Sequence, residues 1–318
     1  MTVSVHEFET ELVVRAVDRV ADEIVALTLA RVDGEALPDW TAGAHIDLVF
    51  DGDLTRQYSL CGSTNDTSTW RVAVLHSRDG RGGSEAVHAL TVGATVRGRG
   101  PRNHFPIVTA SRYLFIAGGI GITPLLAMVH AVDAAGAPWE LQYTGRSRST
   151  MAFADELTDF GDRVSITATG EVGRLDLGAV LDAQLPQTLI YACGPESMLE
   201  EIQERTAQWP AGSLNVERFA AAAPVDSSRD TSFDVVLQRT GRTVTVAADT
   251  TVFDAVRAAG ASVLGSCLEG ICGTCETDVV EGEIEHRDSV LDEEERASGE
   301  TMMICVSRCT SERLVLDL

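Results

Sequence analysis

The stretch Cys267-Leu-Glu-Gly-Ile-Cys272-Gly-Thr-Cys275 lies near the end of the 318-residue chain, and a fourth cysteine, Cys305, follows it. The spacing C-x4-C-x2-C with a distant fourth cysteine is typical of plant-type [2Fe–2S] centres, in which each iron takes two thiolates. Glycines inside the stretch, such as Gly270, permit the tight backbone that such a loop needs. We therefore expect these four cysteines to hold a [2Fe–2S] cluster.

A structural zinc ion is the alternative for the same region. It would use two short pairs, Cys272/Cys275 and Cys305/Cys309. This pairing leaves Cys267 without a role, and the x3 spacing of the second pair is looser than that of most zinc sites. Four-thiolate sites occur with either metal, so the alternative stays open.

The composition describes a globular chain with room for two or three domains. Hydrophobic residues make up 44% of it and the mean hydropathy is +0.05. The formal net charge of −23 disfavours nucleic acid and anionic membranes as partners. The most apolar window, 113–129, is too short for a membrane span and contains Pro124. The acidic start of the sequence does not resemble a signal peptide, and the thiols favour metal binding in the cytoplasm over disulfides.

The first part of the chain, residues 1–108, has the pattern of an antiparallel β-barrel. Short alternating segments are separated by turns, and helical periodicity is absent over most of this length. The expected strands include 24–29, 45–50, 70–75 and 94–97. Within this part, Gly82-Gly83-Ser84 opens a short helix, and backbone N–H groups at a helix N-terminus favour an anion.

Residues 109–221 have the pattern of a doubly wound parallel sheet. The buried strand 113–117 runs into Gly118-Gly119-Ile-Gly121-Ile-Thr123-Pro124 and then into an apolar helix, an arrangement that suits a pyrophosphate. Pro124 fits a first helical turn. Further strands and helices alternate after it, and Cys193-Gly194-Pro195 ends a strand at the carboxyl edge, where ligands of such sheets bind.

The end of the second strand of this sheet bears on the choice of nucleotide. It carries Arg146 and Arg148 and no acidic residue, which by local physics favours the 2′-phosphate of NADPH.

Residues 222–231 form a linker rich in small residues. Residues 232–318 contain two strands, a helix and then the cysteine loop, which fits the β-grasp of plant-type ferredoxins.

Together these segments resemble the ferredoxin–NADP reductase superfamily, and within it the phthalate dioxygenase reductase and vanillate O-demethylase reductase family. The segments that carry the resemblance are Arg56-Gln57-Tyr58-Ser59-Leu-Cys61, Gly80-Arg-Gly82-Gly83-Ser84, Gly100-Pro-Arg-Asn103-His-Phe105, Gly118-Gly119-Ile-Gly121-Ile-Thr123-Pro124, Cys193-Gly194-Pro195, His286-Arg-Asp288 and Leu314-Val-Leu-Asp-Leu318. The similarity covers essentially the whole chain.

The resemblance implies roles for residues of each part. Arg56 would hold the flavin phosphate, Tyr58 would stack on the flavin ring, and Ser59 would bond near its reactive nitrogen. The Cys193 segment would lie beside the nicotinamide. Ser59 and Cys193 are the implied catalytic residues. The implied cofactor-binding residues are Arg56, Gln57, Tyr58, Ser59, Gly82, Gly83, Ser84, Gly118, Gly119, Gly121, Thr123, Pro124, Arg146, Cys193, Gly194, Pro195 and Glu217.

The resemblance also implies the activity. A reductase of this family takes electrons from NADH through FMN to its [2Fe–2S] cluster and on to a Rieske-type terminal oxygenase. FAD and NADPH are the less favoured cofactors. A cytochrome P450 is the alternative partner, and an iron–sulfur carrier module without its own NADH activity is the alternative of another class. We expect a monomer.

The ferredoxin-like part is strongly acidic. From Phe233 onward it contains 17 acidic and 7 basic residues, a net charge of 7 − 17 = −10. Asp288 and the run 292–295 contribute to this charge. Such residues either form a solvated face or steer an oppositely charged partner.

Overall fold

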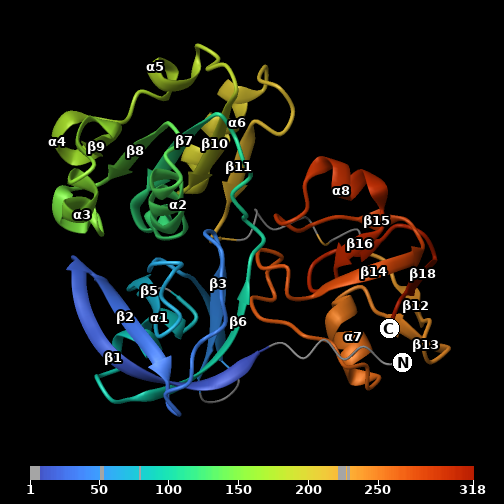
Figure 1. The fold of residues 1–318 in the computed structure, drawn as a ribbon. Helices are drawn as coiled ribbons and strands as arrows, with labels where there is room; N and C mark the ends of the chain where they lie inside the picture. The colour runs from blue at the N-terminus through green and yellow to red at the C-terminus, as the bar shows by residue number, and fades with distance from the viewer. Residues whose placement is uncertain (1–7, 51–53, 79, 221–226, 228–229) are drawn as a thin grey trace. The chain divides into compact units, whose positions relative to one another are not determined.

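The computed structural model describes residues 8–50, 54–78, 80–220, 227 and 230–318. The chain forms two compact units, Met1–Glu217 and Arg218–Leu318, which we call the first and second units (Figure 1). Most of the expected linker, 222–231, lies outside the described residues. Among the helices that the structure describes, none combines the length and apolarity needed to cross a bilayer.

A six-stranded antiparallel sheet forms the first half of the first unit. Its order is β4-β3-β6-β1-β2-β5, and the bridge between Leu60 and Val72 joins the two ends, so the sheet closes as the expected barrel. Trp70 and Leu12 are fully buried inside it. The elements are β1 (Glu9–Ala21), β2 (Ile24–Arg31), β3 (His45–Val49), β4 (Thr55–Ser59), β5 (Trp70–Leu75), α1 (Gly83–His88) and β6 (Thr95–Arg102).

A five-stranded parallel sheet of order β11-β10-β7-β8-β9 forms the second half. Its strands are β7 (Arg112–Gly118), β8 (Trp139–Gly145), β9 (Val164–Ala168), β10 (Thr188–Cys193) and β11 (Leu214–Glu217). The helices are α2 (Ile122–Ala134), α3 (Ala154–Thr158), α4 (Thr169–Val172), α5 (Leu177–Leu181) and α6 (Glu196–Thr206), with 3-10 turns at Gly119–Gly121, Arg148–Thr150 and Gly161–Arg163.

The central strand β7 shows why the sheet is covered on both faces. Successive side chains of a strand point to opposite faces. Phe115 therefore joins the core that contains α2, while Leu114 and Ile116 join a second core with α5 and α6. A run of apolar residues without alternation is typical of such a strand, and the doubly wound prediction is confirmed.

The two halves of the first unit share one core. Barrel residues such as Trp70 belong to the same buried cluster as Leu125 of α2. Tyr191 on β10 also accepts a 2.7 Å hydrogen bond from the backbone N–H of Val108, in the segment between the halves. Strand β10 is thus tied to the segment that follows the barrel. The domain boundary near residue 108 remains a prediction.

The second unit is a mixed sheet of order β13-β12-β18-β14-β16. Its strands are β12 (Phe233–Leu237), β13 (Arg242–Val246), β14 (Glu276–Glu281), β16 (Thr301–Met303) and β18 (Arg313–Leu316), with the small pair β15 (Ile284–Glu285) and β17 (Arg308–Cys309) and the helices α7 (Val252–Ala258) and α8 (Glu293–Ser298). Strands β12 and β18 are parallel, and α7 buries Phe253 and Val256. Residues 259–275 contain no helix or strand, so the cysteine loop is irregular.

Candidate cofactor and electron-transfer sites

Arg56 on β4 lies against the turn that precedes α1. Its guanidinium donates 2.7 Å hydrogen bonds to the carbonyls of Thr55 and Arg81. A Cβ atom on Gly83 would lie 2.2 Å from Arg56 Cγ, so glycine leaves the room that the arginine occupies. Gly82 has a φ of 82°, in the region that favours glycine. The predicted arginine and the predicted turn therefore meet, and a cation beside free N–H groups suits a phosphate.

The other predicted flavin residues follow on the same strand and on α1. Tyr58 is partly buried, and burial raises the pKa of its phenol, so the ring is neutral with one polar tip. The hydroxyl of the buried Ser59 has no hydrogen-bond partner within the described part of the chain. Gln57 lies between them. Ser84 Oγ accepts a 3.0 Å hydrogen bond from the N–H of Ser77, which leaves Ser84 only its backbone N–H for an anion.

The glycine turn after β7 packs directly on the segment that follows β10. Gly119 has a φ of 55°, so its conformation favours glycine. A Cβ atom on Gly118 would lie 2.5 Å from Pro195 Cδ, and one on Gly121 would lie 2.3 Å from the carbonyl oxygen of Cys193. These glycines allow two backbone segments to approach where a side chain would separate them. The structure thus joins two segments that are more than 70 residues apart.

Thr123 and Pro124 contribute to this turn from the first turn of α2. Thr123 Oγ1 donates a 3.0 Å hydrogen bond to the carbonyl of Ile120, and both residues are buried. They shape the start of the helix. Gly194 completes the contact, because a Cβ atom there would lie 2.9 Å from Gly118 Cα.

Cys193 and Glu217 are register partners at the carboxyl ends of β10 and β11. Cys193 is fully buried, and burial raises the pKa of its thiol well above the usual value. Glu217 Oε2 is shielded from solvent and has no hydrogen-bond partner among the described residues. Burial raises the pKa of this carboxyl group to about 8. Both side chains therefore retain a proton near neutral pH, as groups at functional sites often do.

The two arginines at the end of β8 differ in their contacts. Arg148 donates a 2.9 Å hydrogen bond to Asp155, although the Asp155 side chain is 99% exposed. The guanidinium of Arg146 forms no hydrogen bond or ion pair with the residues that the structure describes, and only its carbonyl is engaged, by the N–H of Gly170 at 2.9 Å. Arg146 is the one available to a ligand.

The structure assembles the four predicted cluster cysteines in the second unit. Their sulfur atoms meet in a chain of contacts, Cys272–Cys267–Cys305–Cys275, and all four side chains are buried. Hydrogen bonds from the thiols of Cys272 and Cys305 lower the pKa of Cys267, and the same contacts raise the pKa values of those two thiols. Four such sulfurs cannot all ionise without a nearby cation. The donor set therefore fits a thiolate-bound metal centre, of which a [2Fe–2S] cluster is one.

Cys309, which the zinc alternative requires, makes other contacts. Its Sγ lies 3.0 Å from Ser311 Oγ and 3.6 Å from the carbonyl oxygen of Arg313. Across the described ranges, no three His, Cys, Asp or Glu side chains are arranged around a single metal ion. The four contacting sulfurs leave Cys309 out, which favours the predicted [2Fe–2S] ligand set over the zinc pairing.

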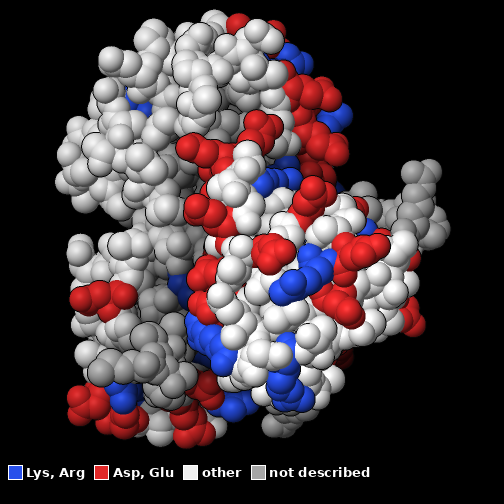
Figure 2. All heavy atoms as spheres, turned by 90° about the vertical axis from the view of Figure 1, so that its right-hand side faces the viewer, with Lys and Arg blue, Asp and Glu red and all other residues white. Residues whose placement is uncertain are grey.

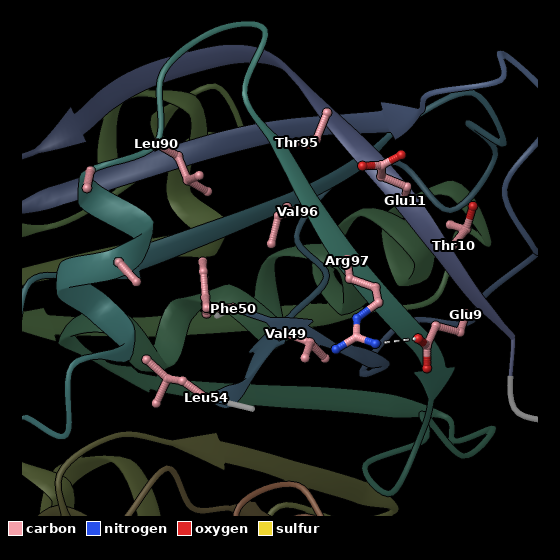
Figure 3. A pocket seen from close by; sticks show the side chains of 12 residues that line it. Glu9, Thr10, Glu11, Val49, Phe50, Leu54, Leu90, Thr95, Val96 and Arg97 are labelled. Carbon is pink, nitrogen blue, oxygen red and sulfur yellow. Dashed lines mark ion pairs between the residues drawn. The ribbon is translucent and has the colours of Figure 1, made fainter. Parts of the chain in front are cut away.

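A separate cavity of about 860 Å³ lies beside α1 (Figure 3). Its lining is largely apolar near Phe50, Leu54 and Leu90, and the ion pair between Arg97 and Glu9, at 3.3 Å, lies at one side. None of the predicted site residues lines it. The cavity is therefore distinct from the residues on β4 that are predicted to bind the flavin.

Sequence patterns did not identify the residues that contact the turn 118–121 or connect the two halves of the first unit. The hydroxyl oxygen of Tyr143 on β8 lies 3.2 Å from the carbonyl oxygen of Gly119 and 3.1 Å from that of Ala152, and it can donate to either. Arg71 of the barrel lies 4.6 Å from the ring centroid of Phe153 and 3.6 Å from Glu156, which connects the two halves. These contacts depend on tertiary structure, and no local motif indicates them.

Comparisons with known proteins agree with this arrangement. The family model described as the 2Fe-2S iron-sulfur cluster binding domain matches residues 235–310. The chain is 41% identical to the toluene-4-sulfonate monooxygenase system reductase subunit TsaB1 of Comamonas testosteroni, over 98% of this chain and 99% of that protein. It superimposes on the crystal structure of phthalate dioxygenase reductase with a TM-score of 0.71, at 33% identity and 98% coverage of both chains.

A third relative is longer than this chain. The chain is 48% identical to part of an intact type IV self-sufficient cytochrome P450 monooxygenase, with a TM-score of 0.92. The match covers 98% of this chain but only 41% of that one. Identity and coverage together settle the family: the chain belongs to the phthalate dioxygenase reductase family of flavin and iron–sulfur oxidoreductases, which includes the reductase subunits of oxygenase systems.

Proposed function

We propose that this reductase transfers electrons from NADH through FMN to a [2Fe–2S] cluster and then to a Rieske-type terminal oxygenase. The observation that carries the proposal is that the predicted residues come together at three places. Arg56 meets the turn 82–84, the turn 118–121 meets the segment 193–195, and four buried sulfurs meet in the second unit. Each site matches one cofactor of the series.

The flavin site uses residues of the barrel half. The Arg56 guanidinium and the N–H groups of 82–84 hold the phosphate, and Tyr58 packs on the ring. Ser59, with its free hydroxyl, orients the ring, and Gln57 assists from the strand between them. A flavin held there would supply the exchange between two-electron hydride chemistry and one-electron transfer.

The nucleotide site uses residues of the parallel sheet. Backbone N–H groups of 118–121 hold the pyrophosphate, with Thr123 and Pro124 fixing the helix start. The segment 193–195 positions the nicotinamide, and the shielded Cys193 thiol and Glu217 carboxyl group exclude water from it. The hydride step itself requires no acid–base residue in this chain.

The choice of FMN and NADH follows the family resemblance. Arg148 is already paired with Asp155, so only Arg146 is available to a 2′-phosphate, and one flexible arginine without supporting donors is a weak phosphate site. FMN needs only the phosphate site beside Arg56. The three predicted domains, 1–108, 109–221 and 232–318, would then each hold one cofactor in a monomeric cytoplasmic protein.

The partner surface belongs to the second unit, with its net charge of −10. Acidic side chains are interspersed with arginines on the face drawn in Figure 2. Asp288 is buried and therefore contributes nothing to this surface. The exposed run 292–295 at the start of α8 supports steering of a basic oxygenase surface.

The test is reconstitution with purified components. The protein should release FMN on denaturation, contain two irons and support NADH-dependent turnover of a Rieske oxygenase. Stoichiometric FAD, or a tenfold preference for NADPH, would contradict the cofactor assignment. Reduction of ferricyanide by NADH distinguishes this reductase from a carrier module, which would show no such activity.

A cytochrome P450 is the second candidate partner. It is supported by the 48% identity to part of a self-sufficient P450, which exceeds the 41% identity to the TsaB1 reductase. A parallel assay with a P450 lacking its own reductase separates the two. If the reductase supports turnover of the P450 but not of the Rieske oxygenase, the partner is a P450. The assignment of the three cofactor sites is then unchanged.

A further inference from the structure

The carboxylate of Asp288 is a buried charge with no role so far. Its side chain is fully buried, which is costly unless the oxygens are hydrogen-bonded. Oδ2 accepts hydrogen bonds from the N–H groups of Val290 at 3.0 Å and Leu291 at 2.9 Å. Oδ1 accepts a 3.3 Å hydrogen bond from the hydroxyl of Ser307. The carboxylate is therefore held by three donors.

These contacts connect Asp288 to both cysteine-bearing segments. Ser307 follows Cys305 by two residues. On the other side, the carbonyl of Gly270 in the cysteine loop accepts a 2.8 Å hydrogen bond from the N–H of Ser289. A Cβ atom on Gly270 would lie 3.0 Å from Asp288 Cα. One short segment, 288–289, thus contacts both of the segments that carry the four cysteines.

Two basic groups face Asp288, and the carboxyl group of Glu276, whose pKa burial raises, lies near enough that the charge of Asp288 helps to raise it. Arg296 on α8 lies 3.7 Å from Oδ2 and donates a 2.6 Å hydrogen bond to the Asp288 carbonyl. His286 Nδ1 lies 3.7 Å from Oδ1, and neither ring nitrogen has a hydrogen-bond partner in the described part of the chain. Neither group forms a close ion pair with the carboxylate, and Arg296 is 38% exposed. The negative charge is therefore only partly compensated.

We propose that Asp288 is a positioning residue of the iron–sulfur centre, which joins the two cysteine segments and lowers the reduction potential of the cluster. The inference rests on the cluster site proposed above. Reduction adds negative charge to the cluster, and a buried carboxylate close to it disfavours that charge in a medium of low polarisability. The hydrogen bond to Ser307 accounts for the joining, and the charge accounts for the potential.

The experiment compares three variants of the full-length holoprotein. Asp288→Asn removes the charge, and Ser307→Ala removes the hydroxyl link at constant charge. Glu281→Gln removes a charge from an exposed position of β14 and is the matched control. Iron content, the potential from an EPR-monitored redox titration, and the rate of cluster loss to a chelator are measured for each.

We expect Asp288→Asn to raise the equilibrium constant for cluster reduction about tenfold, which is 59 mV for one electron, and to speed cluster loss severalfold. Ser307→Ala should speed cluster loss with little change in potential, and Glu281→Gln should change neither. If Asp288→Asn cannot be obtained with its cluster, unchanged cluster loss in Ser307→Ala overturns the inference.

The metal content of the wild-type protein separates the role of Asp288 from the proposed function. A wild-type protein that holds zinc or no iron overturns both. A wild-type protein with its [2Fe–2S] cluster, together with an Asp288→Asn variant that behaves as Glu281→Gln does, overturns only the role of Asp288.

Discussion

The glycine turn of the first unit and the cysteine loop of the second are built in different ways. The turn 118–121 lies between β7 and α2, and its backbone packs on the segment after β10. The cysteine loop belongs to 259–275, which has no helix or strand. Regular elements thus define the first site before its ligand binds, whereas metal ligation contributes to the folding of an irregular loop. The second unit should therefore depend on its cofactor more than the first.

Removal of one cluster ligand is expected to have the largest effect. Cys272→Ser should lose the cluster and reduce electron delivery to an oxygenase by at least about 100-fold, because the transfer has no other route. Flavin reduction by NADH should persist. All four tryptophans, Trp40, Trp70, Trp139 and Trp209, lie in the first unit, so their unfolding transition should not move. Stopped-flow absorbance and tryptophan fluorescence measure the two effects.

Cys309→Ser is the matched control for that variant and should retain two irons. If Cys309→Ser loses its metal while Cys267→Ser keeps it, the pairing of the zinc alternative is correct. A shift of the tryptophan transition in Cys272→Ser would show that the units are not independent.

Gly83→Ala tests the close contact between Arg56 and the turn 82–84. The new Cβ would lie 2.2 Å from Arg56 Cγ, so the guanidinium would leave its two carbonyl partners. We expect flavin affinity to fall about tenfold or more, roughly 1.4 kcal/mol or above, with the cluster retained. Flavin titration of the apoprotein measures it. Glu85→Ala, at an exposed position of α1, is the control, and equal affinities would exclude the proposed contact.

Much of this organisation could be predicted from the sequence because short-range patterns encode it. The cysteine spacing, the glycine turn before an apolar helix and the alternating strands all depend on neighbouring residues. The contacts of Arg71 with Phe153, and of Asp288 with Ser307, join distant segments and have no local pattern. Asp288 illustrates the limit, because its charge suggested a surface residue whereas tertiary packing buries it.

Glu217→Gln should change the pH dependence of stability in the first unit only. Burial raises the pKa of Glu217 from 4.5 to about 8, so the folded state holds a proton that the unfolded state has released. The contribution of this group to stability is complete below pH 4.5 and is lost as the pH rises to about 8. Because the residue is partly exposed, we expect a loss on the order of 1 kcal/mol, which the variant should not show.

Tryptophan-monitored urea unfolding of the flavin-free protein at several pH values measures that loss. Glu204→Gln, at an exposed position of α6, is the control, and its unfolding free energy should depend on pH as that of the wild type does. If the unfolding free energies of the wild type and Glu217→Gln depend on pH in the same way, the pKa of the Glu217 carboxyl group is not raised.

The smallest effect concerns nucleotide choice at the end of β8. The guanidinium of Arg146 has no partner among the described residues, whereas Arg148 is paired with Asp155. An exposed pair of this kind is weak, but it biases Arg148 away from a ligand.

We expect NADH to be preferred. Arg146→Ala should lower kcat/KM for NADPH several-fold and leave that for NADH nearly unchanged, because only NADPH carries the 2′-phosphate. Arg148→Ala should have the smaller effect on NADPH. Steady-state kinetics with both nucleotides decide the matter. A wild-type preference for NADPH of tenfold, about 1.4 kcal/mol, would mean that a flexible arginine at a strand end suffices to bind the phosphate. The nucleotide site would then, like the cysteine loop, be completed by its ligand.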